Sequence, residues 1–139
     1  DIGISIGLLK KYAISPKLNI MLGVSPLQTR KEIMDTVDTL KSMHIDNVMF
    51  SLATPFKGTD FYQLAKAQGW LTGDSDTIDP LGKSIISYPN LTKEDLESLQ
   101  KSAYRFFYLR PGFILQRVKN WIDPGNLVRD IKIGARIFR

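Results

Sequence analysis

Two short turns carry the residues of this sequence that could bind a ligand. One runs from Gly23 to Pro26, after the apolar run Leu18–Val24, and the other runs from Ser51 to Gly58. In parallel α/β sheets, substrates bind at the carboxyl ends of the strands and in the loops that follow them. Exposed carbonyls and amides there can hydrogen-bond the edge of a flat heterocycle. Three apolar side chains could pack on the face of such a ring: Met21, Leu22 and Leu52. Tight turns also require Gly and Pro without any ligand, so the pattern alone leaves both interpretations open.

The remaining composition excludes several other kinds of site. The sequence has a single histidine, His44, and no cysteine. It therefore supplies no cysteine nucleophile, no disulfide and no cysteine-held zinc or iron–sulfur cluster. One histidine without a second ligand at metal spacing makes neither a metal site nor a Ser-His-Asp triad. We expect no catalytic residue and no metal ligand in this chain.

The elements that must position the two turns follow the order strand, helix, strand, helix. Leu18–Val24 and Asn47–Leu52 are apolar runs typical of strands buried on both faces of a parallel sheet. Between them, Thr29 and Glu32 form a capping box ahead of apolar residues at helical spacing, which predicts a helix over 29–43. Thr59 is expected to cap the next helix, whose inner face carries an apolar stripe and which ends at Gly69.

The C-terminal third predicts further helices. A loop rich in Asp, Ser, Gly and Pro spans 73–89. Thr92 then opens a helix whose apolar stripe (Leu96, Leu99, Ala103 and Phe106/Phe107) continues until Pro111 breaks it. Apolar residues at helical spacing over 127–138 predict a last helix, so the segment 90–139 is expected to be helical.

The predicted sheet is incomplete. Two parallel strands that are buried on both faces do not make a stable sheet by themselves. The chain could be a fragment of a larger α/β domain, could complete its sheet with a second copy, or could draw a further strand from 83–89. We favour the fragment.

Length and charge allow one domain with a basic end. The 139 residues carry a net charge of +5, and the excess lies in 100–139, which hold 9 Lys or Arg against 2 Asp or Glu. Four of these cations and the aromatics among them could grip an anionic surface or a partner protein: Arg105, Arg110, Arg117 and Lys119, with Tyr104, Phe106, Phe107 and Tyr108. The contrary interpretation is that the aromatics are core and the cations are solvated. The sequence shows neither a signal peptide nor an apolar run long enough for a membrane span, which predicts a cytoplasmic protein that contacts neither membrane nor nucleic acid.

Two stretches carry a resemblance to a known family. Residues 19–71, NIMLGVSPLQTRKEIMDTVDTLKSMHIDNVMFSLATPFKGTDFYQLAKAQGWL, resemble the later barrel strands of radical S-adenosylmethionine (SAM) enzymes, in the branch that often carries a cobalamin-binding domain. Residues 90–118, NLTKEDLESLQKSAYRFFYLRPGFILQRV, resemble the helical segment that follows in that branch. The resemblance covers about residues 8–120. Gln28 departs from it, because many relatives have a glutamate there.

The resemblance implies a fold, and it implies which half of the enzyme holds the cluster. The fold is α/β, the C-terminal part of a partial (β/α) barrel with parallel strands followed by a helical extension. Residues 1–71 would be the second half of the barrel, 72–89 a loop and 90–139 the extension. The family cleaves SAM at a four-iron four-sulfur cluster held by three cysteines and so generates a 5′-deoxyadenosyl radical. This chain has none of those cysteines, so the N-terminal half of the same enzyme is the expected partner, and the chain alone is expected to be inactive.

The resemblance also implies which residues lie near SAM. Met21 and Gly23, at the end of the first strand, are expected to lie near SAM. At the end of the second strand, backbone contacts to the adenine are expected from Ser51, Leu52, Ala53 and Thr54. Cobalamin, the identity of a small-molecule substrate and self-association of the chain are left open.

Overall fold

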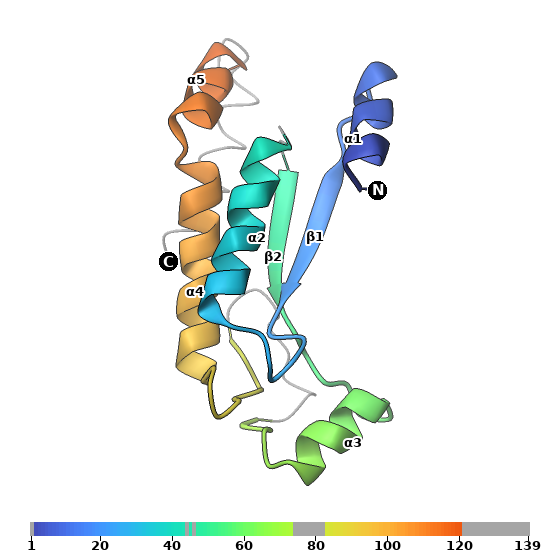
Figure 1. Ribbon diagram of the computed structural model, residues 1–139, viewed down its shortest axis with the longest axis vertical. Coiled ribbons are helices and arrows are strands. Elements are labelled where there is room, and N and C mark those ends of the chain that lie inside the picture. The colour runs from blue at the N-terminus through green and yellow to red at the C-terminus, as the bar shows by residue number, and fades with distance from the viewer. Residues whose placement is uncertain (1, 44, 46, 74–82, 121–139) are drawn as a thin grey trace.

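The computed structural model describes residues 2–43, 45, 47–73 and 83–120 (Figure 1). In chain order, the elements of this part are α1 (Ile2–Lys11), β1 (Lys17–Leu22), α2 (Arg30–Ser42), β2 (Asn47–Leu52), α3 (Asp60–Ala67), α4 (Lys93–Tyr108) and α5 (Pro111–Asn120). The predicted order of strand, helix, strand, helix is confirmed, although β1 ends at Leu22 and not at Val24. His44 and the helix predicted over 127–138 lie outside the described residues.

β1 and β2 form a two-stranded parallel sheet, in register from Lys17 opposite Asn47 to Leu22 opposite Leu52. α2 connects them and begins where the capping box predicts. The Thr29 hydroxyl accepts a hydrogen bond from the Glu32 amide at 3.2 Å, and the Glu32 carboxylate accepts one from the Thr29 amide at 2.8 Å. Such a cap contributes about 1 kcal/mol, because it satisfies amides that have no partner within the helix.

α4 begins in the same way and lies beside α2. Thr92 and Asp95 form its capping box, and an ion pair between Arg30 and Asp95 joins the two helices at the surface. Of the predicted apolar stripe, Leu96, Leu99, Ala103 and Phe107 are buried. Phe106 is the exception: it is exposed and lies under the Lys41 ammonium, 5.0 Å from its ring centroid.

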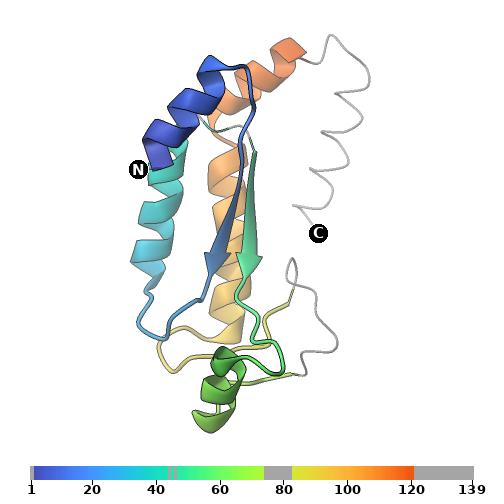
Figure 2. The ribbon, with the colours of Figure 1, turned by 90° about the vertical axis from the view of Figure 1, so that its right-hand side faces the viewer.

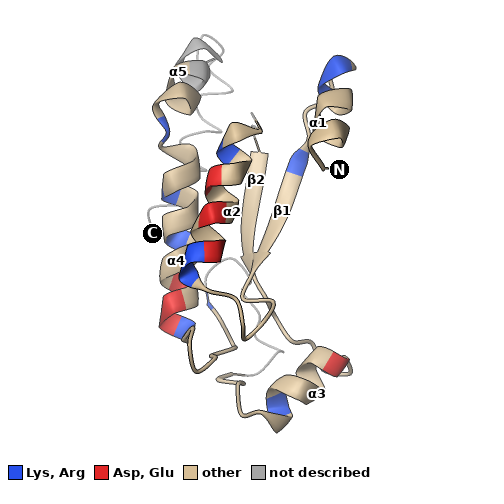
Figure 3. Ribbon diagram, viewed as in Figure 1, with Lys and Arg blue, Asp and Glu red and all other residues tan. Residues whose placement is uncertain are grey.

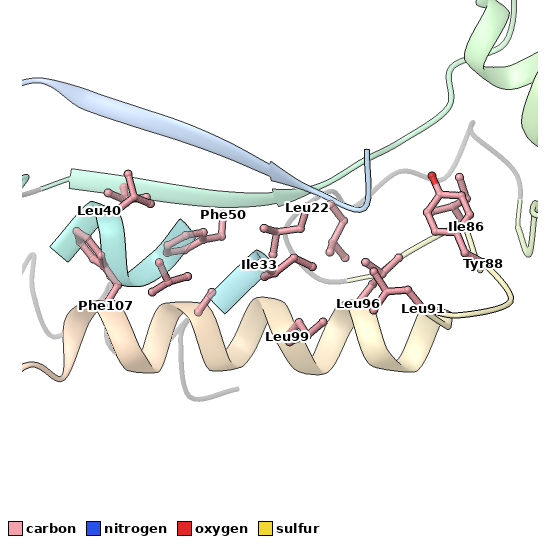
Figure 4. Packing of buried hydrophobic residues seen from close by; sticks show 14 of the residues in the cluster. Leu22, Ile33, Leu40, Phe50, Ile86, Tyr88, Leu91, Leu96, Leu99 and Phe107 are labelled. Atoms are coloured by element: carbon pink, nitrogen blue, oxygen red, sulfur yellow. The ribbon is translucent and has the colours of Figure 1, made fainter. Parts of the chain in front are cut away.

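The hydrophobic core lies between the sheet and these two helices. Figure 4 shows Leu22 and Phe50 pointing from the strands toward the row of Leu96, Leu99 and Phe107 on α4. The α2 members of this core are Ile33, Val37 and Leu40. Each fully buried side chain of this size contributes about 1.5–3 kcal/mol, so this face of the sheet holds the fold together.

The opposite face of the sheet is not covered by a helix of the described chain. Figure 2 views the two strands with α2 and α4 behind them. Along β1, Lys17, Asn19 and Met21 are exposed, and the residues between them are partly or fully buried. The prediction that Leu18–Val24 is buried on both faces is therefore wrong for β1. The alternation of exposure is that of a strand with one covered face, which the apolar Met21 concealed in the sequence.

α3 and the segment after it lie at the carboxyl ends of the strands (Figure 1). α3 is capped by the predicted Thr59 and ends at Ala67. Gly69 follows two residues later with a left-handed φ of 69°, the position at which the sequence predicts the helix to stop. Of its predicted inner face, Ala65 is buried and Leu64 is 49% exposed. The alternative that 83–89 supplies a further strand is not supported: in the described residues, this segment forms one isolated antiparallel bridge, from Ile86 to Leu71.

α1 was not predicted from the sequence. Its first residues alternate isoleucine with glycine and serine, a pattern that favours a strand over a helix. The helix ends at Lys11. Two residues later Ala13 adopts a left-handed φ of 57°, and the Ile14 amide donates to the Leu9 carbonyl at 2.9 Å. Ile6 is the buried residue of α1, whereas Ile2, Ile4 and Leu8 are exposed.

Candidate functional site

The carboxyl ends of β1 and β2 lie side by side, at the end of the sheet nearest α3 (Figures 1 and 2). The pairing extends one residue beyond β2, because the Ala53 amide donates to the Leu22 carbonyl at 2.8 Å. Beyond that bond the two chains separate into the predicted turns. Both turns therefore begin at the same edge of the sheet, as the parallel order requires.

Gly23 shapes the first turn, and its conformation is constrained by its φ, by the contact with Leu96 and by two hydrogen bonds. Its φ of 74° favours glycine, and a Cβ atom placed there would come within 2.8 Å of Leu96 Cδ2. Its amide donates to Gln28 Oε1 at 2.7 Å, and its carbonyl accepts from the Tyr88 hydroxyl at 2.8 Å. Both of its backbone groups are thus engaged within the chain. Gly23 positions the turn and has no free amide to offer a ligand.

Tyr88 comes from the segment between α3 and α4, far from Gly23 in sequence. Its side chain is 1% exposed and packs edge-on against Trp70, with ring centroids 5.1 Å apart. Burial raises the pKa of Tyr88 to about 12, so the hydroxyl remains a hydrogen-bond donor throughout the neutral pH range. The turn at Gly23 is therefore attached to the core by a hydroxyl that keeps its proton at neutral pH.

The uncovered face of the sheet offers a small neutral patch near these ends. Met21 and Ser51 are opposite each other in the register, and Met21 is 51% exposed. The Ser51 hydroxyl donates to Asn19 Oδ1 at 3.1 Å across the strands. Figure 3 shows the acidic and basic residues on the helices, and Lys17 at the far end of β1 is the one charged residue in the two strands. Ser51 itself is 7% exposed, so the side chains of this patch that are open to a ligand are the Met21 thioether and the Asn19 amide. A thioether and an amide side by side suit a flat ring that carries heteroatoms.

The remaining predicted contacts differ in what they present. Leu52 is 2% exposed and belongs to the core, as does Leu22, so neither side chain can pack on a ligand. That part of the prediction is wrong, because both side chains point to the helix-covered face. Ala53 is buried with its amide engaged, and Thr54 is half-buried with its hydroxyl donating to the Leu52 carbonyl at 3.2 Å.

Two residues of this region were not among the predicted contacts. Asn19 is the one polar residue in the run Leu18–Val24, and that isolated polarity was the signal that could have identified it. Gln28 was seen in the sequence only as a replacement of a common glutamate. In the structure, the Gln28 side-chain oxygen accepts a hydrogen bond from the Gly23 amide and so holds the turn. A glutamate oxygen could accept the same hydrogen bond.

Most of the aromatic residues of α4 make contacts within the fold. Phe107 is buried, and the Tyr104 and Tyr108 hydroxyls bond to β2. The Arg110 guanidinium lies 4.3 Å from the Phe107 ring centroid and donates to the Ile45 carbonyl at 2.9 Å. These contacts favour the interpretation that the aromatics are core. The side chains of Arg117 and Lys119, which also entered the prediction of a basic binding surface, lie outside the described ones.

The described part of the chain offers neither a metal site nor a membrane-spanning helix. No cluster of three or more His, Cys, Asp or Glu residues there could hold a metal ion. Among the same residues, no helix is both long and apolar enough to cross a membrane.

The chain was compared with protein-family models and with known proteins. No family model matches the chain. The chain is similar to a protein of Pyrococcus horikoshii named as an uncharacterized methyltransferase: the two are 30% identical over 113 residues, which are 78% of this chain and 24% of that protein. The chain thus spans about a quarter of the length of this relative.

Proposed function

We propose that this chain is the part of a radical SAM enzyme that contacts the adenine side of SAM. The observation that carries the proposal is the neutral patch of Met21, Ser51 and Asn19 at the carboxyl ends of two parallel strands. The methyltransferase name of the relative also supports it, because SAM is the usual methyl donor of methyltransferases. The sequence resemblance to radical SAM enzymes supplies the finer assignment.

The residues of the patch have distinct roles in this proposal. The exposed Met21 thioether packs on the face of the adenine, since sulfur makes favourable contacts with aromatic rings. The exposed Asn19 presents its amide to the ring edge, and the buried Ser51 hydroxyl holds that side chain in place by donating to its oxygen. Gly23 contributes through the shape of its turn, with Gln28 and Tyr88 as the residues that fix that turn.

The one-sided covering of the sheet supports a segment of a partial (β/α) barrel. In a barrel, helices cover the outer face of the strands and the inner face points toward the interior. A doubly wound sheet would instead have helices on both faces. In the described chain, the core with α2 and α4 lies on one face of the sheet (Figure 2). Asn19 and Met21 alternate along β1 with the covered residues, so they lie on the other face.

The iron–sulfur cluster does not fit the residues of this chain. The sequence has no cysteine, and the described residues hold no cluster of other metal-binding side chains. The proposal therefore assigns the cluster, and the radical chemistry that it supplies, to another segment of a longer polypeptide. No residue of this chain is assigned to cobalamin.

One experiment tests the reaction class. A polypeptide that joins this chain to a segment with a Cys-x3-Cys-x2-Cys motif is reconstituted with iron and sulfide under anaerobic conditions, reduced and mixed with SAM. We expect 5′-deoxyadenosine from this polypeptide and none from the 139-residue chain treated identically. Formation of S-adenosylhomocysteine without 5′-deoxyadenosine would leave a SAM-dependent transferase and refute the radical class.

A second experiment tests the placement of SAM. Met21→Lys brings a cation next to the positively charged sulfonium compound and removes an apolar contact, so it should weaken SAM binding by at least about tenfold. Leu109→Lys is the matched control, because Leu109 is 48% exposed against 51% for Met21 and lies beyond the last turn of α4. Equal SAM affinity of the two variants in calorimetry would exclude Met21 from the site.

A further inference from the structure

A buried segment between α3 and α4 lies at the carboxyl ends of the strands. We call residues 84–91 the strap. Its large side chains are hidden from solvent: Ile86 is 0%, Tyr88 1% and Leu91 0% exposed. Figure 4 shows these three residues as a group that extends the core beyond Leu22 toward the start of α4. The strap is therefore part of the core, whereas most connecting segments run over the surface.

The strap is bonded to the chain that follows α3. The Thr72 amide donates to the Ile85 carbonyl at 2.9 Å, and the Ser87 amide donates to the Trp70 carbonyl at 2.8 Å. These two bonds flank the isolated antiparallel bridge described above. α3 comes directly after the turn Ser51–Gly58 in the chain. The strap is thus connected to the second of the two turns through α3.

The strap is also bonded to the beginning of α4. The Ser84 amide donates to Glu97 Oε1 at 2.9 Å, and the Ser87 hydroxyl accepts from the Lys93 amide at 3.2 Å. The second bond satisfies an amide in the first turn of α4 that has no partner within the helix. The strap is thus held from two sides, by the segment after α3 and by α4.

The middle of the strap constrains the first turn. The Tyr88 hydroxyl donates to the Gly23 carbonyl, and Leu96, in the first turn of α4, occupies the space in which a Cβ of Gly23 would lie. Of the two hydrogen bonds of Gly23, the one to Gln28 lies within the turn and the other comes from the strap. The strap therefore joins the two turns: it holds the first through Tyr88 and the second through α3.

We infer that the strap is a positioning segment of the SAM site, whose docking through Tyr88 sets the Gly23 turn, so that SAM binds more tightly when the strap is docked. The link to SAM rests on the proposed function, whereas the coupling of strap and turn rests on the contacts alone. Tyr88 is a positioning residue, because it acts on the ligand through Gly23. Coupling between two sites is reciprocal, so bound SAM must favour the docked strap by the same factor.

Amide hydrogen exchange in the 139-residue chain tests the coupling without SAM. Tyr88→Phe keeps the ring against Trp70 and removes the hydroxyl, so the Gly23 amide should exchange about tenfold faster. Tyr108→Phe is the matched control. Its hydroxyl also donates to a strand carbonyl, that of Val48 at 2.7 Å, but near the opposite end of β2. Unchanged exchange of Gly23 in Tyr88→Phe, or equally fast exchange in both variants, would overturn the inference.

Exchange in the longer polypeptide tests the link to SAM. Saturating SAM should slow exchange of the Thr72 and Ser87 amides, which hold the strap, by at least about tenfold. The Ile14 amide, which lies before the first residue of β1, is the internal control and should not change. In Tyr88→Phe the slowing should be lost although SAM still binds, a difference that a merely structural role of Tyr88 would not produce. Equal slowing in Tyr88→Phe, or none in the unsubstituted polypeptide, would contradict the inference.

The failure of this inference can be distinguished from the failure of the proposed function. If the longer polypeptide does not bind SAM, the proposed function is refuted, whereas faster exchange of Gly23 in Tyr88→Phe still supports the coupling of strap and turn. If the polypeptide binds SAM and forms 5′-deoxyadenosine but the strap amides do not slow, the inference is refuted and the proposed function stands.

Discussion

Replacing Gly23 by alanine tests how the turn at the candidate site is held. The left-handed φ of 74° costs a non-glycine residue about 1–2 kcal/mol. The new Cβ would also come within 2.8 Å of Leu96 Cδ2 and 3.1 Å of Leu96 Cδ1, in a fully buried part of the core. Overpacking of this kind costs about 1–3 kcal/mol. Gly23→Ala should therefore lower the free energy of unfolding by about 2–5 kcal/mol.

Gly69→Ala is the matched control for the backbone contribution. Gly69 has a φ of 69°, and a Cβ placed there meets no atom within 4 Å. Its substitution should cost only the backbone strain of about 1–2 kcal/mol. The difference between the two variants, measured by urea titration, is then the cost of the Leu96 contact.

A double mutant separates the contact from other effects at Gly23. Leu96→Ala alone should cost about 2–5 kcal/mol, because it leaves a cavity in the core. In that background, however, Gly23→Ala should cost no more than Gly69→Ala does, because the methyl groups that it meets are gone. If Gly23→Ala costs the same with and without Leu96, or never exceeds the control, the reasoning that Leu96 limits this turn is wrong.

Three further predictions concern the side chains that fix the site and the sheet edge. Tyr108→Phe should lower the free energy of unfolding by about 1–3 kcal/mol in urea titration, because it leaves the Val48 amide and carbonyl without partners. Tyr12→Phe is the control: Tyr12 is 68% exposed, so its substitution should change the free energy of unfolding little. Gln28→Glu should keep the stability of the wild type at pH 7, whereas Gln28→Leu should lower it by about 1 kcal/mol because the Gly23 amide loses its acceptor. Burial raises the pKa of Tyr88 from its ordinary value of 10.0 to about 12. The stability that its protonated hydroxyl contributes is therefore full below pH 10 and is lost as the pH rises through 12. Tyr88→Phe should flatten the fall in unfolding free energy over that range, and an unchanged slope would contradict this prediction.

The local parts of this fold were predictable from sequence, and the long-range parts were not. The capping boxes at Thr29 and Thr92 and the strand Asn47–Leu52 depend on neighbouring residues, and all three lie where the sequence places them. The candidate site was found through a rule of strand ends, which located Met21 and Ser51 but could not tell which side chains face the core. Leu22 and Leu52 were misplaced for that reason.

The contacts that were missed join residues far apart in the chain. Tyr88 is 65 residues from the Gly23 carbonyl that it bonds. No local pattern marks such a pair, because the tyrosine at the end of a polar loop is equally typical of an exposed residue. The bonds from the Tyr104 and Tyr108 hydroxyls to β2 were hidden for the same reason, because both tyrosines look like part of an amphipathic stripe until the strand beside them is known.

The sequence distance between β2 and the tyrosines of α4 that bond to its backbone has a consequence for synthesis of the protein on the ribosome. Val48 and the tyrosine that caps it, Tyr108, are separated by 60 residues. At about 5–20 residues per second, the ribosome needs roughly 3–12 s to make the intervening segment. During that interval β2 has a bare edge that can pair with another nascent chain. The protein is thus most prone to aggregate during its synthesis, before α4 has left the exit tunnel. A slower rate of translation between β2 and α4 should therefore increase the aggregated fraction.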